Sequence, residues 1–545
     1  MTSPRKETNL AAALRPLVRV IQGELLDQTA PSLGGAIQPN VPQRHEAGVG
    51  PSGRLQQVPA LKSDHQYRFR SHLRCATDQI NKNWSASVPA TPSELCFDLS
   101  DHKLGDARPA GGPTPPASRI ASLDVLRGFA LLGILVLNIE MFSGPEGALH
   151  DVPLGLAKPA FVGWHAGLDL TIFAAKWMFF EGKMRTLFSM LYGAGIVLLT
   201  QRFEARGEDG NAADIFCRRN LWLLLFGVIH GTLIWGGDIL SQYALIALLL
   251  MFPFRRVGGR RLVILGAVVG ILGGSLGVLR MSDAPAEFRA ERLRQEAAAA
   301  AAHHQRLSAE QNAILASDTR QASEAPARIV RELKEGRSSY VESIAPRAEA
   351  YFRFVEALFR SGWILEVVGS MFIGMGLFKL GFLTGELSRR RYLLIAAAGY
   401  AVALPIILFG VEVSARHGFA AATVLRSLFL PYPLEVFAAS IANASVILAV
   451  ERSRCFRPIA RALANVGRTA FSNYILTSLI CQFVFGWGPW KLYGSIEYYQ
   501  QLYAVAAVWA FNLVASALWL RVFRFGPFEW AWRSLVYWCP QPMRR

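Results

Sequence analysis

The residues best suited to chemistry in this 545-residue chain are His230 and Asp238. His230 stands in an otherwise apolar stretch, and the turn Gly236-Gly237 that follows it can bring Asp238 back beside the imidazole. A carboxylate that orients an imidazole prepares it as a general base, for example in acyl transfer. The alternative is a histidine that hydrogen-bonds a neighbouring helix and only stabilises the protein.

Two loop histidines, His150 and His165, are further candidate bases, since each has an acidic residue close by in sequence. Their spacing matches no ligand pattern for zinc, and we expect no metal site. Four more polar residues are predicted to gather near them at the outer ends of the first spans and to bind substrate: Asn138, Glu181, Lys183 and Arg185. Lys183 and Arg185 suit a carboxylate or phosphate, or alternatively a lipid headgroup at the interface.

Asp124 and Arg127 lie one helical turn apart at the other end of the first apolar segment. They are expected to form a salt bridge, with Arg127 alternatively meeting the phosphate of a cytosolic ligand. Glu366 and Glu435 are intramembrane carboxylates without a neighbouring cation in their own segments. They suit a proton relay or a purely structural role equally well.

The elements that must position these residues are membrane-spanning helices. The chain is 52% hydrophobic and 18% charged, with apolar runs long enough to cross a bilayer. We predict an all-α polytopic bundle of about ten spans, at 122–142, 185–202, 219–236, 238–254, 262–280, 355–378, 392–412, 426–450, 469–487 and 503–523. The apolar stretch from Phe161 to Phe180 is predicted to be an interfacial or re-entrant helix, because counting it as a span would divide the arginine clusters between both faces.

The net charge of +17 comes from lysines and arginines in short loops between spans, which excludes a nucleic-acid partner and makes the lipid bilayer the main partner. Both termini are then cytoplasmic. The predicted organisation is a disordered extension at 1–118, a five-span half at 119–280, an extracytoplasmic helical insert at 281–353, a second five-span domain at 354–538 and a tail at 539–545.

Four segments together resemble the YeiB-like bacterial membrane proteins, whose C-terminal domain has no known function. They are SLDVLRGFALLGILVLN at 122–138, GKMRTLFSMLYGAG at 182–195, GRTAFSNY at 467–474 and FGPFEWAWRSL at 525–535. The resemblance implies a multi-pass protein of the bacterial plasma (inner) membrane, and transport has been suggested as the role of such proteins.

The opening motif, Leu-Asp-x-x-Arg-Gly followed by an asparagine, is also similar to that of membrane-embedded acetyltransferases of the heparan glucosaminide acetyltransferase type. That likeness implies transfer of an acyl group from cytosolic acyl-CoA to an extracytoplasmic glycan or lipid acceptor, with an outward histidine as the catalytic residue. His150, His165 and His230 all remain candidates for it. No permanently bound cofactor is expected, and acetyl-CoA is the candidate donor. The alternative function is a proton-coupled transporter or exporter of a small molecule or lipid, and a scaffold whose insert docks a partner is a third.

Overall fold

The computed structural model describes residues 120–145, 161, 163–205, 207, 209–451 and 453–545. All of them belong to one compact unit. The extension predicted at 1–118 and the candidate base His150 lie outside the described residues. Within the described part, the fold is helical and carries a single isolated β-bridge, between Phe523 and Arg544. The predicted all-α class is therefore confirmed.

Helices before the insert are α3 (Ala121–Ser143), α4 (Ala166–Phe179), α5 (Lys183–Glu204), α6 (Asp209–Leu233), α7 (Leu240–Ile246) and α8 (Gly259–Met281). The insert and its continuation into the bundle comprise α9 (Ala284–Ala302), α10 (Ala309–Gly336) and α11 (Tyr340–Ser361). The remaining helices are α12 (Ile364–Lys379), α13 (Arg389–Arg416), α14 (Ala421–Val424), α15 (Tyr432–Val450), α16 (Arg457–Arg468), α17 (Ala470–Cys481), α18 (Gln501–Val522) and α19 (Pro527–Tyr537).

Five of these helices, α3, α8, α13, α15 and α18, are each long and apolar enough to cross a bilayer. Two bent pairs, α11 with α12 and α16 with α17, bring the number to seven if each counts as one span. The protein is thus a multi-pass membrane protein, and the count of ten stays a prediction. The predicted span at 355–378 is not one straight helix, because Gly362 adopts a left-handed conformation and the chain bends by 75° there.

A short helix, α4, lies in the stretch from Phe161 to Phe180, and its placement at the interface or as a re-entrant helix stays a prediction. Its 14 residues are about 21 Å long, which is less than the thickness of the hydrocarbon core. The helix packs against α13 and α15 through Phe173 and Trp177, which are buried. One face of α4 therefore belongs to the protein core.

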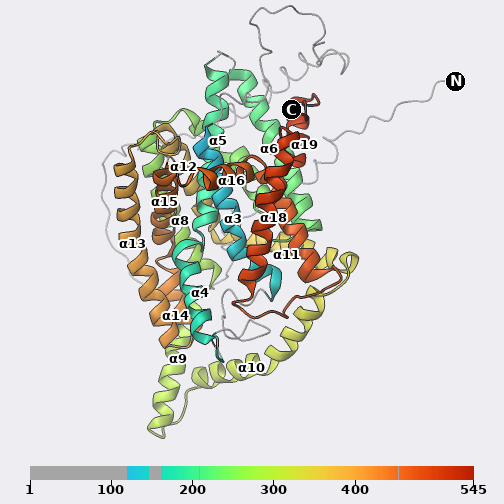
Figure 1. Cartoon of the computed structure of the whole chain (residues 1–545). Helices are drawn as coiled ribbons and strands as arrows, with labels where there is room; N and C mark the ends of the chain where they lie inside the picture. The colour runs from blue at the N-terminus through green and yellow to red at the C-terminus, as the bar shows by residue number, and fades with distance from the viewer. Residues whose placement is uncertain (1–119, 146–160, 162, 206, 208, 452) are drawn as a thin grey trace, which may run out of the picture. The chain divides into compact units, whose positions relative to one another are not determined.

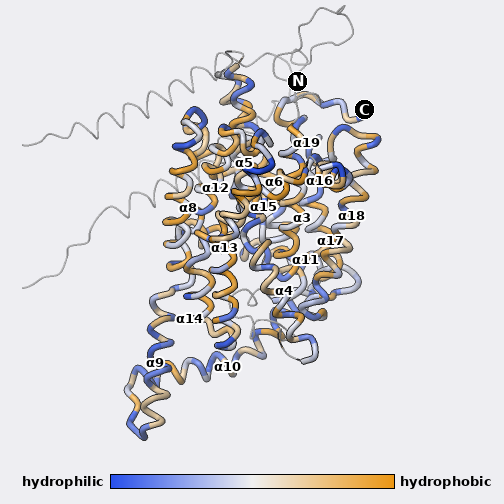
Figure 2. The backbone as a smooth tube through the Cα atoms, turned by 60° about the vertical axis from the view of Figure 1, so that its left-hand side comes forward, coloured by the Kyte–Doolittle hydropathy of each residue, from blue (hydrophilic) through white to orange (hydrophobic). Residues whose placement is uncertain are grey.

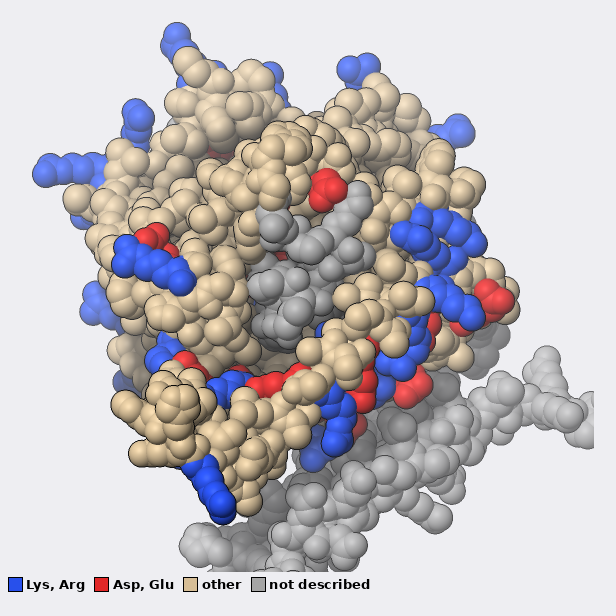
Figure 3. All heavy atoms as spheres, turned by 90° about the horizontal axis from the view of Figure 1, so that it is seen from below, with Lys and Arg blue, Asp and Glu red and all other residues tan. Residues whose placement is uncertain are grey.

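The insert lies at one end of the bundle, and α16 and α19 lie at the other (Figure 1). Its helices α9 and α10 are hydrophilic where the bundle helices are mainly hydrophobic (Figure 2). Seen from the insert end, acidic and basic side chains mix along it, while much of the remaining face is uncharged (Figure 3). Arg294 holds α9 to α10 through Asp318, at 2.9 Å.

Cationic segments from distant parts of the sequence meet at the opposite end. Arg255 pairs with Glu204 at 2.9 Å, and Lys379 donates to the backbone oxygen of Arg255 at 2.6 Å. Arg218 donates to the backbone oxygen of Val536 at 3.2 Å. This clustering is the arrangement that the positive-inside rule requires of one membrane face.

Glycines let α12 approach α5 and α8 backbone to backbone. A Cβ atom at Gly374 would lie 1.9 Å from the backbone oxygen of Met190, and one at Gly369 would lie 2.5 Å from that of Gly266. Small residues at such crossings allow helices to pack closely where the hydrophobic effect cannot drive association. The two predicted five-span halves are therefore in intimate contact.

We expect Gly374→Ala to lower the stability of the bundle by roughly 1–3 kcal/mol, the usual cost of over-packing. The added methyl group would meet the backbone of α5, which cannot move aside as a side chain can. Gly195→Ala on α5 is the matched control, because a Cβ atom there has nothing within 4 Å. The check is the apparent melting temperature of both purified variants in detergent; equal values would contradict the contact.

Candidate functional site

The structure places His230 and Asp238 side by side. His230 lies near the end of α6, where the backbone N–H groups of Ile234 and Trp235 both donate to its carbonyl oxygen at 2.9 Å and turn the chain back. The imidazole Nδ1 lies 3.0 Å from the Asp238 carboxylate, and both side chains are almost completely buried. The glycine turn thus produces the pairing expected from the sequence.

The Asp238 carboxylate is held from several directions. The backbone N–H and the hydroxyl of Ser241 donate to its Oδ2 at 2.8 and 2.7 Å. Tyr351, which belongs to α11, donates its hydroxyl to Ser241 Oγ at 2.8 Å. Tyr474 of α17 donates to Asp238 Oδ1 at 3.4 Å. A carboxylate fixed in this way favours the tautomer with a proton on Nδ1 of His230.

This leaves Nε2 of His230 as the hydrogen-bond acceptor of the ring. Nε2 is buried and has no hydrogen-bond partner among the described residues. A buried nitrogen of this kind is costly unless another molecule uses it. This arrangement suits a general base, because the carboxylate orients the ring and the lone pair lies on Nε2, the nitrogen that faces away from the carboxylate.

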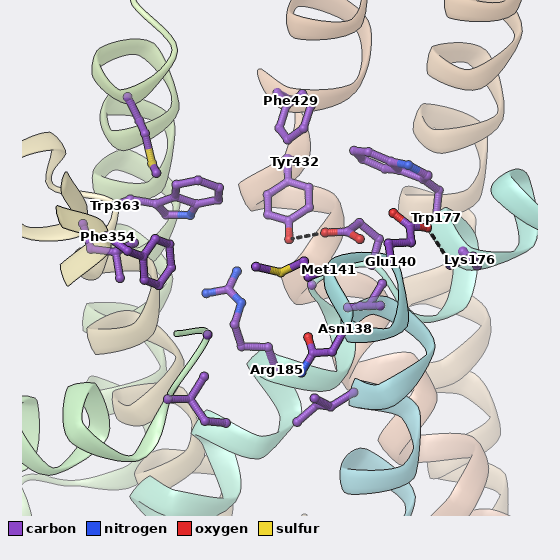
Figure 4. Close-up of a pocket in the computed structure, with 18 of the residues that line it drawn as sticks. Asn138, Glu140, Met141, Lys176, Trp177, Arg185, Phe354, Trp363, Phe429 and Tyr432 are labelled. Carbon is purple, nitrogen blue, oxygen red and sulfur yellow. Dashed lines mark hydrogen bonds and ion pairs between the residues drawn. The ribbon is translucent and has the colours of Figure 1, made fainter. Parts of the chain in front are cut away.

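A cavity of about 260 Å³ is lined by Trp235, Gly237 and Ile239, close to this pair in the sequence, and is called the aromatic cavity here (Figure 4). Its walls include the rings of Trp177, Trp235, Phe354, Trp363, Phe429 and Tyr432. Its polar lining comes from Asn138, Glu140, Lys176, Glu181, Arg185 and Gln242. The predicted substrate-binding residues Asn138, Glu181 and Arg185 are thus brought together, from the end of α3 and from the segment that begins α5.

Ion pairs between helices surround the aromatic cavity. Lys176 pairs with Glu140, which also accepts from the Tyr498 hydroxyl at 2.9 Å. Arg185 pairs with Glu366 at 2.7 Å. The site therefore already neutralises much of its own charge.

Lys183 differs from the prediction that it binds an anionic ligand. It is completely buried, does not line the cavity and pairs with Glu435 at 2.7 Å. Glu366 and Glu435, which have no neighbouring cation in their own helices, thus both obtain one from α5. An intramembrane charge is retained where another helix compensates it, so these ion pairs fasten α5 to α12 and α15.

A second cavity, of about 250 Å³, is called the arginine cavity because five arginines line it: Arg127, Arg202, Arg219, Arg468 and Arg533. Two acids line it too. Asp124 forms the predicted salt bridge with Arg127, at 2.8 Å. Glu529 accepts from the backbone N–H groups of Phe471 and Ser472 at 2.6 and 3.2 Å. The lining is therefore strongly cationic and suits an anion such as phosphate.

The two cavities meet next to His230 and Asp238, although neither of these two side chains lines a cavity. The His230 ring contacts Trp235 of the aromatic cavity, with ring centres 6.4 Å apart, and Tyr474 of the arginine cavity, at 4.8 Å. Ile134, in the middle of α3, and Ile239, directly after Asp238, line both cavities. Gly237 lines the aromatic cavity, whereas Tyr474, which contacts Asp238, lines the arginine cavity. The 23 residues of α3 extend over about 34 Å, so the two cavities together follow a length comparable with a bilayer core.

His165 lies elsewhere. Its Nδ1 is 2.8 Å from Asp169 within α4, and its ring is 5.4 Å from that of Tyr499. It lines neither of the two cavities. Among the described candidate bases, His230 is the one whose ring contacts a residue of each cavity, Trp235 and Tyr474.

Ser241, Tyr351 and Tyr474 were not among the residues predicted for the site. Ser241 carries a local signal, because an aspartate three residues before a serine at a helix start is a typical capping arrangement. Tyr474 stands within one of the family-like segments, GRTAFSNY. Tyr351 is 110 residues from Ser241, and no sequence pattern connects the two.

Comparisons with family models and with known proteins agree on one family. The model of the family "Protein of unknown function (DUF418)" matches residues 377–539. YxaH of Bacillus subtilis (strain 168) is 29% identical over 448 residues, which cover 79% of this chain and 98% of that protein. YeiB of Escherichia coli (strain K12) is 30% identical over 424 residues, covering 77% and 96%. Both relatives are described as uncharacterised. No solved structure matches the chain.

The covered regions of these relatives extend over nearly their whole length, so the likeness concerns the membrane protein as a unit. The expectation drawn from the four sequence segments is thereby confirmed: the chain belongs to the YeiB family.

Proposed function

We propose that this protein transfers an acyl group across the bacterial plasma membrane, from cytosolic acyl-CoA to a hydroxyl or amine of an extracytoplasmic glycan or lipid. The observation that carries the proposal is the position of His230, a buried imidazole that is oriented by Asp238 and contacts Trp235 of one cavity and Tyr474 of the other. One cavity suits an anionic donor and the other an acceptor with an apolar or ring-shaped body. A base between them is placed for transfer from one to the other.

The arginine cavity is the proposed donor site. Arginine binds phosphate in a bidentate manner, and the acids beside these arginines already have partners of their own. The cationic end of the bundle faces the cytoplasm by the positive-inside rule, and acyl-CoA is available there. Arg127 and Ile134 are seven residues apart on α3, about 10 Å along the helix axis. The donor must therefore carry its acyl group on a long arm, as the pantetheine thioester of acyl-CoA does.

The proposed reaction balances with His230 as the base. The acceptor gives its O–H or N–H proton to Nε2 while its lone pair attacks the thioester carbonyl carbon. The carbon–sulfur bond breaks, and the departing sulfur takes the proton back from the imidazole. The products are the acylated acceptor and the free CoA thiol. Asp238 keeps the imidazole oriented and stabilises its protonated form.

Transport is the second candidate function. It is favoured by the same two cavities, because Ile134 and Ile239 line both and a shift of such side chains could open a continuous path. The carboxylates suggested as proton carriers fit it less well. Glu366 and Glu435 each hold a buried or partly buried cation of α5, and protonation would leave that cation without its partner.

Acetyl-CoA should bind the purified protein in a saturable manner, and Arg219→Ala should weaken binding by about tenfold or more. A charge-assisted hydrogen bond contributes about 1.5–3 kcal/mol, which is the basis of this magnitude. Isothermal titration calorimetry in detergent measures both affinities. Arg353→Ala is the control, because that residue is exposed and pairs with Glu349 in the same helix, α11. A folded protein that does not bind acetyl-CoA would rule out the proposed donor.

His230→Gln and Asp238→Asn should each reduce acyl transfer by a factor of about 100 or more, the usual contribution of a general base. The measurement is the appearance of radiolabel from acetyl-CoA in glycans and lipids of membrane vesicles that contain the protein. His165→Gln is the matched control, because that histidine also pairs with an aspartate but its ring contacts Trp164 and Tyr499, which line neither cavity. Equal losses in all three variants, or full activity of His230→Gln, would contradict the assigned base.

A further inference from the structure

We propose that the aromatic cavity binds an ammonium group, with the carboxylate of Glu181 as its counter-ion. Binding of the ammonium group does not require an acyl donor. The inference rests on the proposed function only where it takes this ligand to be the acyl acceptor. Its chemical class is an amine-bearing amphiphile or sugar. The headgroup of an aminophospholipid and an amino sugar share this chemistry.

The charge balance around the cavity carries the proposal. Three cations lie in or behind its wall, and each has a carboxylate of its own: Lys176 with Glu140, Lys183 with Glu435, and Arg185 with Glu366. Glu181 is the fourth carboxylate of this group. No lysine, arginine or histidine of the described chain pairs with it within 4.0 Å. The ionised cavity therefore has one negative charge in excess.

Glu181 is also weakly hydrogen-bonded. The side-chain partner found for it is the Tyr432 hydroxyl, at 3.5 Å, a distance at the outer limit for such a bond. Figure 4 marks this hydrogen bond of the Tyr432 hydroxyl with a dashed line and shows Tyr432 in the same cavity as Arg185 and Trp177. The carboxylate thus retains lone pairs that a ligand with N–H groups can use.

The local backbone holds Glu181 in this place. Gly182 follows it with φ of 66°, a left-handed conformation that suits glycine. A Cβ atom at Gly182 would lie 1.9 Å from the Tyr432 hydroxyl oxygen. The glycine therefore lets α5 begin directly after Glu181 and lets Tyr432 approach the carboxylate.

The rings of the cavity suit a cation as well. The faces of tryptophan and tyrosine attract ammonium groups through their quadrupoles. The Lys183 ammonium group already lies 5.8 Å from the ring centres of both Trp177 and Tyr432. Trp363, Phe354 and Phe429 add apolar surface for the body of the ligand. An excess carboxylate in such surroundings is costly alone and is compensated when a cation binds.

The test compares charged and neutral probes of matched shape. Glucosamine is compared with glucose, and glycerophosphoethanolamine with glycerophosphoglycerol, by calorimetry on the full chain in detergent. We expect at least one ammonium probe to bind at least tenfold more tightly than its neutral counterpart. The pair that shows the preference identifies the source as a sugar or a lipid headgroup. Equal binding within both pairs, or no binding of either ammonium probe, overturns the proposal.

Variants of the carboxylate complete the test. Glu181→Gln should abolish the preference for the ammonium probe, and Glu181→Asp, which retains the charge, should keep part of it. Glu412→Gln, at an exposed surface glutamate, is the control. A preference that survives in folded Glu181→Gln overturns the proposal, and if that variant does not fold, the wild-type comparison decides alone. Acetyl-CoA binding and transfer dependent on His230 are measured separately, so failure here is distinguishable from failure of the proposed function.

Discussion

The rest of the structure depends on the need to compensate the cations at the start of α5. Lys183 and Arg185 enter an apolar bundle together, and a charge in such a place requires a partner of opposite sign. Glu435 of α15 and Glu366 of α12 supply these partners. Because both carboxylates come from the C-terminal part of the chain, the ion pairs set the position of α5 against two helices that follow it by more than 150 residues. The backbone contact between Gly374 of α12 and Met190 of α5 fixes the crossing of these two helices as well.

The position of α5 in turn determines where the cavities lie. Its first turns, with Arg185, face the aromatic cavity, and its remaining length, from Phe188 to Arg202, lines the arginine cavity. Helix α3 runs beside it and contributes Asn138 to one cavity and Arg127 to the other. The segment between α6 and α7 lies where the two cavities meet, because Ile239 lines both of them. Ile239 directly follows Asp238, so the glycine turn that positions Asp238 also positions Ile239. Fold and site are therefore consequences of the same few contacts.

The sequence predicts well what is local or periodic. Apolar runs are enough to identify the helical class, and the Gly236-Gly237 turn is enough to bring Asp238 to His230. It does not predict contacts between helices, because hydrophobic periodicity shows that a helix is buried and leaves its neighbours undetermined. The partners of Lys183 and Arg185, the role of Tyr351 and the meeting of the two cavities at Ile134 all depend on such contacts. The break at Gly362 was missed for a related reason, since the apolar run continues through it.

Helix α11, which continues the insert into the bundle, contacts the surroundings of His230 and Asp238 through Tyr351. Tyr351 packs its ring over Gly231, where a Cβ atom would lie 2.4 Å from it, and its own side chain is only 2% exposed. The ring thus covers the residue that follows His230, and its hydroxyl donates to Ser241, which in turn holds Asp238. In the proposed acyl transfer, covering of this kind would limit the access of water, since hydrolysis of the thioester is the side reaction that such a site must suppress. Helix α11 thereby couples the insert to the His230–Asp238 pair, and a change in the position of the insert would be transmitted to Asp238 through Tyr351 and Ser241.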